Sequence, residues 1–224
     1  MRFDIITIFP QILDSYFNES ILSRAQENKQ IKIKTHNLRQ WTKDKHHTVD
    51  DTPYGGGAGM VMKLEPLYQA IQATKKHSKK LFRKNKQSVI LLSAKGQTWN
   101  QRLAKKYSQL DSLILVCGRY EGVDERLLEF VDAEISIGDY VLTGGELGAA
   151  IIIDSIARLL PGVLGNEASS QDESHIKSGI LEYPQYTKPE VFKIKGQEYR
   201  VPQVLLSGNH QAIAEWRNKQ RKEK

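Results

Sequence analysis

Three short apolar segments in the middle of the chain, each running into a glycine-bearing turn, constrain the fold most strongly. They are QSVILLS (87–93), LILVCG (113–118) and AEISIG (133–138). Helical spacing follows the first two at 98–110 and 123–131, and a largely apolar helix is expected over 144–160. Apolar strands that alternate with helices are typical of a parallel sheet covered on both faces. We therefore predict an α/β fold built on a parallel sheet.

The alternation of strands and helices also covers the chain before these segments, and it ends after residue 160. Strands are expected over 2–9 and 31–37, and helices over 20–30 and 65–74, with a long polar loop at 43–60. The PG pair at 161–162 ends the alternation. We predict three parts, namely a domain over 1–164, a polar linker over 165–179, and a small, mainly helical domain over 180–224.

Charge and cysteine usage narrow the class of protein. The net charge of this 224-residue chain is +7, and residues 75–86 hold seven Lys or Arg and no acid. That run is either a solvated linker or a surface for a nucleic-acid backbone. No apolar run approaches the roughly 20 residues that span a bilayer. Cys117 is the only cysteine, so no intramolecular disulfide can form and we expect a cytoplasmic protein.

Each of the three apolar segments ends in a glycine-bearing stretch, which we call the first (91–97), second (116–122) and third (136–145) exit. The three exits predict one shared pocket, because ligands of open α/β sheets bind at the carboxyl ends of strands. None of the exits matches the glycine pattern of a dinucleotide fold or a P-loop. They also lack the Lys and Arg cluster that would meet a triphosphate. Ile137, Val141 and Leu142, with Tyr140 nearby, can enclose a flat purine, although each alone would more often be ordinary core. An adenosine-like ligand is the favoured interpretation.

Three polar motifs have two interpretations each. Glu121 at the second exit is placed to meet a cationic ligand, or it belongs with 124–126 to a surface ion-pair cluster. The glycine-rich stretch 52–60 is either an anion-binding nest of backbone amides or a plain loop. The His and Asp residues within 46–51 resemble metal ligands, but without a second cluster we predict no metal site.

Five longer motifs closely resemble the bacterial tRNA (guanine-37-N1)-methyltransferase family. They are TVDDTPYGGGAGM (48–60), GRYEGVDER (118–126), SIGDYVLTGGEL (136–147), DSIARLLPGVLGNEAS (154–169) and LLSGNHQAIAEWR (205–217). The resemblance covers essentially the whole chain. It implies a SPOUT-class enzyme with a trefoil knot at an S-adenosylmethionine site, which general rules of chain connection would exclude. It also implies a homodimer with its active site at the subunit interface, and a C-terminal domain that binds tRNA.

The resemblance further implies the site residues. The cofactor site is expected to comprise Leu92, Ser93, Gly96, Gly118, Tyr120, Glu121, Gly122, Ser136, Ile137, Gly138, Asp139, Tyr140, Val141, Leu142, Gly144 and Gly145. Arg158 matches the family's catalytic-site arginine. Such an arginine can stabilise the charge that develops on guanine O6 as the N1 proton leaves.

The catalytic base is the point at which the chain departs from the family. Guanine N1 must lose a proton before it attacks a methyl group, and the family uses a linker aspartate followed by serine. Here Glu173 occupies that register before Ser174, Asp172 stands one residue earlier, and His175 replaces an aromatic residue. A glutamate reaches roughly 1.5 Å further, and a misplacement of about 1 Å can cost ~100-fold in rate. We favour Glu173 as the base, while Asp172 as the base and reduced activity remain alternatives.

Two other functions stay open at this level. The altered linker is compatible with an RNA-binding or cofactor-binding SPOUT homologue with reduced turnover. A SPOUT methyltransferase for another RNA is the second alternative. The sequence does not determine whether magnesium is required.

Overall fold

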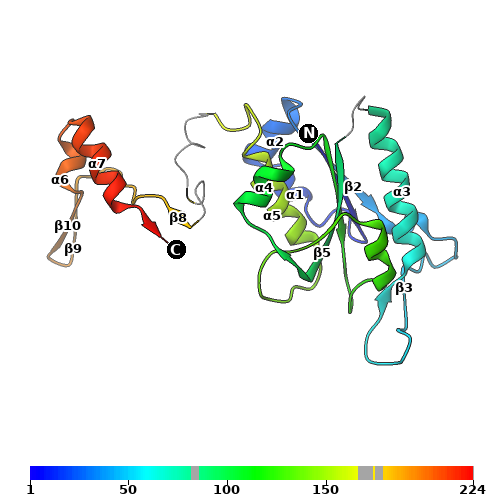
Figure 1. Ribbon diagram of the computed structural model, residues 1–224. Coiled ribbons are helices and arrows are strands. Elements are labelled where there is room, and N and C mark those ends of the chain that lie inside the picture. Colours follow the sequence, from blue (N-terminus) through cyan, green and yellow to red (C-terminus); the bar gives the residue numbers. More distant parts are fainter. Residues whose placement is uncertain (82–85, 166–173, 175–178, 224) are drawn as a thin grey trace. The chain divides into compact units, whose positions relative to one another are not determined.

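The computed structural model describes residues 1–81, 86–165, 174 and 179–223. The chain divides into two compact units, Met1–Gly165 and Asn166–Lys224. The first unit holds the large sheet, and the described residues of the second form two-stranded sheets and two helices (Figure 1). Of the helices formed by the described residues, none is both long enough and apolar enough to cross a membrane.

A five-stranded parallel sheet forms the centre of the first unit, in the order β2-β1-β6-β5-β7. Its strands are β1 (Arg2–Thr7), β2 (Lys32–Asn37), β5 (Gln87–Thr98), β6 (Ser112–Cys117) and β7 (Ala133–Ser136). The predicted α/β fold with a parallel sheet is confirmed.

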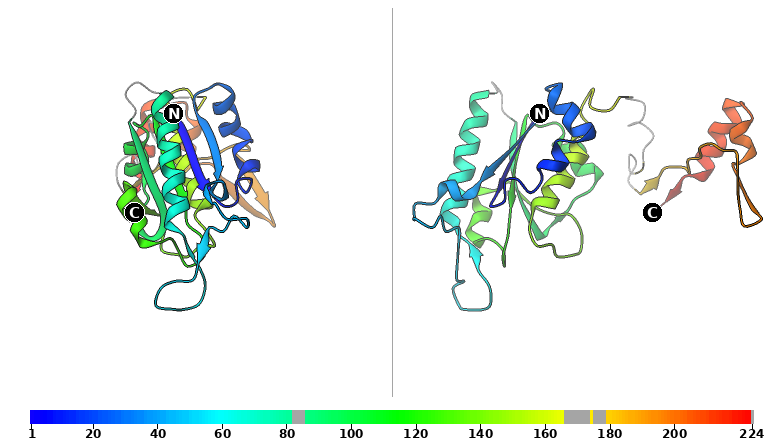
Figure 2. Two further views of the ribbon diagram at one scale, coloured as in Figure 1. Left: turned by 90° about the vertical axis from the view of Figure 1, so that its right-hand side faces the viewer. Right: turned by 180° about the vertical axis from the view of Figure 1, so that it is seen from behind.

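Helices cover both faces of this sheet (Figure 1 and Figure 2). One face carries α1 (Asp14–Phe17), α2 (Ser20–Glu27), α4 (Gln101–Tyr107) and α5 (Glu146–Ala157); the other carries α3 (Leu64–Leu81) and the 3₁₀ helices η1 (Leu38–Trp41) and η2 (Glu125–Phe130). Alternate residues of a strand point to opposite faces. Ile90 and Leu92 therefore join the core under α4 and α5, whereas Val89 and Leu91 join the core under α3. Burial on both faces explains why the strands are apolar at nearly every position.

The strand order reverses at β5. From β5 the chain crosses to β6 on one side, and it then returns to β7 on the other side. Such a switch point opens a crevice at the carboxyl ends of the strands, which is where ligands of open α/β sheets bind. The second and third glycine-bearing exits follow β6 and β7, and the first lies within β5, where its pairing with β7 is interrupted between Leu92 and Gln97.

Several elements differ from their expected bounds. The strand expected at 87–93 continues to Thr98, because an irregularity between Leu92 and Gln97 lets it pair again with β7. The segment expected to be an α-helix at 123–131 is the shorter 3₁₀ helix η2. Within the expected loop, β3 (Asp50–Asp51) pairs with β4 (Val61–Met62). Helix α3 includes 75–81, so the linker interpretation is wrong for that part of the basic run; 82–85 lie outside the described residues.

The second unit mixes helices and strands, so "mainly helical" understates its strand content. It contains β8 (Ile180–Leu181), β9 (Val191–Ile194), β10 (Gln197–Arg200), α6 (Gln203–Leu206), α7 (His210–Gln220) and β11 (Lys222–Glu223). β9 and β10 form a hairpin closed by Lys195 and Gly196, whose φ angles are 48° and 78°. Two positive φ values are typical of the tightest hairpin turn.

Candidate functional site

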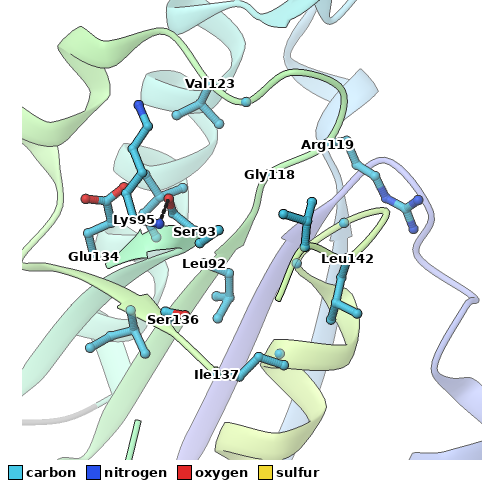
Figure 3. Close-up of a pocket in the computed structure, with 18 of the residues that line it drawn as sticks. Leu92, Ser93, Lys95, Gly118, Arg119, Val123, Glu134, Ser136, Ile137 and Leu142 are labelled. Atoms are coloured by element: carbon cyan, nitrogen blue, oxygen red, sulfur yellow. Dashed lines mark hydrogen bonds between the residues drawn. The ribbon is translucent and has the colours of Figure 1, made fainter. Parts of the chain in front are cut away.

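A pocket of about 250 Å³ opens at the carboxyl ends of β5, β6 and β7. This volume lies just below the usual range for small-molecule sites. Figure 3 shows Leu92, Ile137 and Leu142 around its centre, with Lys95 and Glu134 towards one end and Arg119 towards the other. The three exits therefore meet at one site, as their glycines predicted.

Most of the residues expected at the cofactor site line this pocket. Those that do are Leu92, Ser93, Gly118, Tyr120, Glu121, Gly122, Ser136, Ile137, Tyr140, Val141, Leu142, Gly144 and Gly145. Gly96, Gly138 and Asp139 do not line it. A Cβ at Gly96 would overlap the backbone of β7, and one at Gly138 would lie 2.5 Å from the Tyr140 ring. These two glycines therefore permit close packing of the protein itself.

The turn after β7 is held by its own hydrogen bonds. The Ser136 hydroxyl donates to the Gly138 carbonyl at 3.0 Å and accepts from the Gly138 N–H at 3.2 Å. The Tyr140 hydroxyl donates to the Ile137 carbonyl at 3.3 Å. The next residue, Val141, is left 87% exposed. A fixed turn that exposes apolar side chains at a pocket offers a surface for an apolar ligand or partner.

Gly145 brings the third exit against the second. Its N–H donates to the Gly118 carbonyl at 3.0 Å. A Cβ at this position would lie 2.8 Å from the Leu92 Cβ and 2.9 Å from the Cys117 Cα. Only glycine allows this approach without displacing backbone.

Glu121 is separate from the ion pairs that follow it. Arg126 pairs with Asp124 at 2.6 Å, and Lys95 lies 3.6 Å from Glu125. No described residue forms an ion pair with Glu121. The ion-pair interpretation therefore holds for part of 124–126, while the Glu121 carboxylate stays available at the pocket.

The glycine-rich loop lies beside Glu121. The Glu121 N–H donates to the Met60 carbonyl at 3.0 Å, and a Cβ at Gly59 would lie 2.5 Å from the Glu121 Cγ. Gly55, Gly56 and Gly57 all have positive φ angles. Neither the nest nor the plain-loop interpretation is decided by this placement. Among the described residues, His, Cys, Asp and Glu form no group of three that could hold a metal ion.

Arg158 lies at the far end of α5 from the pocket. α5 begins at Glu146, beside the third exit, and rises about 18 Å over its 12 residues. Arg158 is the exposed residue that follows the helix, and its N–H donates to the Asp154 carbonyl at 3.2 Å. The structure does not bring Arg158 to the pocket of its own chain.

Both candidate bases, Glu173 and Asp172, lie outside the described residues, as does His175. Ser174 is described, and its hydroxyl accepts a 2.9 Å hydrogen bond from the Glu182 N–H. The choice between the two carboxylates stays a prediction from sequence.

The pocket also contains residues that were not predicted for the cofactor site from the sequence. They are Leu91, Ala94, Lys95, Arg119, Val123, Glu125, Leu128, Glu134, Ile135, Thr143 and Gly148. Arg119 and Thr143 sit inside the motifs already noted, so their position was a usable signal. Val123 also lies inside a noted motif, 118–126, shortly before the 3₁₀ helix η2. Leu128 lies within η2, and nothing in the local sequence marks it.

Comparison with known proteins identifies the family. The profile described as "tRNA (Guanine-1)-methyltransferase TrmD" matches residues 1–224. A protein of Dictyoglomus turgidum named tRNA (guanine-N(1)-)-methyltransferase is 51% identical over 98% of this chain and 84% of its own. Proteins of the same name from Clostridium botulinum and Dehalococcoides mccartyi are 52% and 48% identical, over 97% and 98% of this chain and 85% of theirs. The chain therefore belongs to the tRNA (guanine-1)-methyltransferase TrmD family.

Proposed function

We propose that the protein transfers a methyl group from S-adenosylmethionine to N1 of the guanine at position 37 of tRNA. The observation that carries this proposal is the pocket formed where the three glycine-bearing exits meet. Membership of the family supports methyl transfer, and the names of the relatives support a tRNA guanine as the acceptor. Position 37 rests on the resemblance of the sequence motifs.

The lining of the pocket fits this methyl donor. Leu92, Ile137 and Leu142 provide apolar contacts for a flat adenine ring. The donor also has a sulfonium and an ammonium group, and the carboxylates of Glu121 and Glu134 lie in the lining to meet positive charge. The basic residues of the lining, Lys95 and Arg119, are each paired with a carboxylate. Such a pocket suits a cationic nucleoside better than a nucleotide triphosphate.

The chemistry requires a base and a stabiliser for negative charge. The bound donor supplies an electrophilic methyl group on sulfur. A linker carboxylate, which we assign to Glu173 with Asp172 as the alternative, removes the N1 proton of guanine. With the donor bound, the N1 lone pair would take the methyl group, and sulfur would keep the electrons of the broken S–C bond. Arg158 stabilises the charge on O6 during the transfer.

The proposal includes a homodimer, because Arg158 and the pocket lie at opposite ends of α5. Leu147, Ile151 and Arg158 follow one another at helical spacing on one face of α5. Leu147 and Ile151 are 59% and 44% exposed. A second copy that covers this face would bury the apolar residues and bring its own Arg158 towards the pocket of the first.

The finer architecture belongs to the same proposal. The hydrogen bond between Gly145 and Gly118 supports a tight crossing of the second and third exits, as a trefoil knot requires. The basic end of α7, with Arg217 and Lys219 in its last turn, supports tRNA binding by the domain over 180–224. We assign the methyltransferase domain to 1–164, the linker to 165–179, and the location to the cytoplasm.

Labelled S-adenosylmethionine tests the function directly. Purified protein is incubated with a tRNA transcript that has guanine at position 37, and with the same transcript carrying adenine there. We expect label in the first RNA only. Label in both would indicate another target nucleotide. Tight binding of the donor without label in either RNA would favour a binding homologue and overturn the proposal.

A further inference from the structure

An ion pair joins the second and third exits at the pocket, between the half-buried Arg119 of its lining and the buried Glu146. The Nε atom of Arg119 lies 3.0 Å and 3.2 Å from the two carboxylate oxygens of Glu146, and one terminal nitrogen lies 3.0 Å from the nearer of them. The other terminal nitrogen donates to the Thr143 carbonyl at 3.1 Å. The Arg119 side chain thus bonds both to the Thr143 backbone in the third exit and to Glu146, the first residue of α5.

Glu146 is also held from the first strand. The hydroxyl of Thr7, the last residue of β1, donates to its carboxylate at 2.6 Å. The Glu146 side chain is only 2% exposed. A buried carboxylate is costly unless hydrogen-bond donors surround it. The positions of Thr7 and Arg119 therefore determine where the beginning of α5 lies.

Gly144 shows how tightly the pair fills this space. A Cβ at Gly144 would overlap the guanidinium of Arg119 and would lie 2.6 Å from the nearer carboxylate oxygen of Glu146. Arg119 is confined on another side by Phe9, whose ring centroid lies 4.7 Å from the guanidinium carbon. A shift of either charged residue would therefore move the backbone of 143–145.

Glu146 and Thr7 are absent from the lining of the pocket, whereas Gly118, Gly144 and Gly145 belong to it. We infer that Glu146 is a positioning residue. Together with Thr7 and Arg119, it fixes 143–145 against 118–122 and so sets the shape of the pocket. The inference rests on the proposed function, since the ligand whose affinity it governs is S-adenosylmethionine.

Substitution of Glu146 tests this role from outside the pocket. In Glu146→Gln an amide N–H₂ faces the guanidinium, so at least one bond to Arg119 is lost. We expect S-adenosylmethionine to bind about tenfold more weakly by calorimetry, the loss typical of one charge-assisted hydrogen bond. In the methylation assay, KM for the methyl donor should rise while KM for tRNA stays unchanged. Thr7→Val, which leaves the ion pair intact, should weaken binding in the same direction but less.

The matched control is Asp4→Asn. Asp4 lies on the same strand as Thr7, is equally buried, and forms a 2.6 Å ion pair with Arg2. Asp4 and Thr7 are three residues apart on β1, so their side chains point to opposite faces of the sheet and that of Asp4 points away from Glu146. If the effect were only a general loss of stability, both variants would change the affinity alike. We expect Asp4→Asn to bind the methyl donor as tightly as the unchanged protein.

All proteins are compared at a temperature at which circular dichroism shows them folded. Unchanged affinity in folded Glu146→Gln, or an equal loss in Asp4→Asn, would overturn the positioning role. If Glu146→Gln does not fold, unchanged affinity in Thr7→Val would overturn it. Failure of the unchanged protein to bind S-adenosylmethionine would instead overturn the proposed function, and the positioning role with it.

Discussion

The backbone N–H of Gly145 donates a 3.0 Å hydrogen bond to the carbonyl of Gly118. This bond joins the third exit to the second, and both residues line the pocket. The two residues are far apart in the sequence, and the contact exists because the chain returns past β5 to form β7. The pocket therefore depends on a close backbone approach as well as on its side chains.

Gly145→Ala should damage both the fold and the pocket. The new Cβ would meet the Leu92 Cβ at 2.8 Å and the Cys117 Cα at 2.9 Å, and neither atom is the end of a flexible side chain. We expect a loss of about 1–3 kcal/mol in the free energy of unfolding, measured in urea, and weaker binding of S-adenosylmethionine. Gly165→Ala is the control, because a Cβ there meets nothing within 4 Å. Equal stability of the two variants would contradict the packing described here.

Asp4 should make the free energy of unfolding depend on pH in the acidic range. Burial raises the pKa of its carboxyl, but hydrogen bonds from His36 and Arg2 outweigh burial and leave the pKa below its ordinary value of 3.8. The folded protein therefore holds this proton less tightly than the unfolded chain. The stabilisation is present above about pH 4 and is lost as the pH falls through the folded pKa.

Urea unfolding between pH 6 and pH 3 measures this contribution. Asp4→Asn should be less stable than the unchanged protein by roughly 3 kcal/mol at pH 6, because Arg2 stays buried without a carboxylate. The difference should shrink towards pH 3. A difference independent of pH would show that the Asp4 carboxyl does not titrate with folding.

Arg158→Ala should separate catalysis from cofactor binding. We expect kcat to fall about 100- to 1000-fold, as when one stabilising donor is removed from a reaction site. Affinity for the methyl donor should stay within about twofold, because we assign Arg158 to the charge on guanine O6 and not to a contact with the donor. A large loss of affinity would show that Arg158 contributes to the pocket rather than to the transfer.

Leu147→Asp should disrupt the homodimer. The substitution places a charge in the exposed apolar face of α5, beside Ile151. Light scattering should show a dimer for the unchanged protein and a monomer for the variant, and the monomer should lose methylation. Ile194→Asp in β9 is the control, because Ile194 is an apolar residue exposed to a similar degree (46%) in the second unit, and this variant should stay dimeric. A monomeric unchanged protein would refute the interface.

Glu173→Gln should lower the single-turnover methylation rate about 100-fold or more, because a general base contributes a factor of that order. Asp172→Asn should keep most of the rate. Both amides leave side-chain size nearly unchanged, so donor binding serves as the control and should not differ. The opposite ranking of the two rates would assign the base to Asp172.

The sequence predicted the sheet and the location of the pocket because both follow from local patterns. Apolar strands buried on both faces leave continuous apolar runs, and strand exits that approach each other closely require glycine. Gly96 does not line the pocket, and close approach of β5 to β7 demands glycine there as strictly as a ligand would. The β9–β10 hairpin was missed although its Lys195–Gly196 pair was a usable turn signal.

Glu146 lies inside the motif 136–147, but the local sequence does not show that its side chain is buried. A glutamate in the first turn of a helix is ordinarily an exposed residue that complements the helix dipole. Its burial depends on Thr7 and Arg119, which are distant in sequence and meet it only through the strand order. The distance of Arg158 from the pocket likewise follows from the position of α5, which the local sequence does not determine.

The most direct test of the proposed function is the position and identity of the methylated nucleoside. Unmodified tRNA with guanine 37 is treated with the protein and S-adenosylmethionine, digested with a base-specific nuclease, and analysed by mass spectrometry. We predict a single added methyl group on the fragment that contains position 37, recovered as 1-methylguanosine after complete digestion. A methyl group on another nucleotide, on another atom of guanine, or on none would contradict the proposed function.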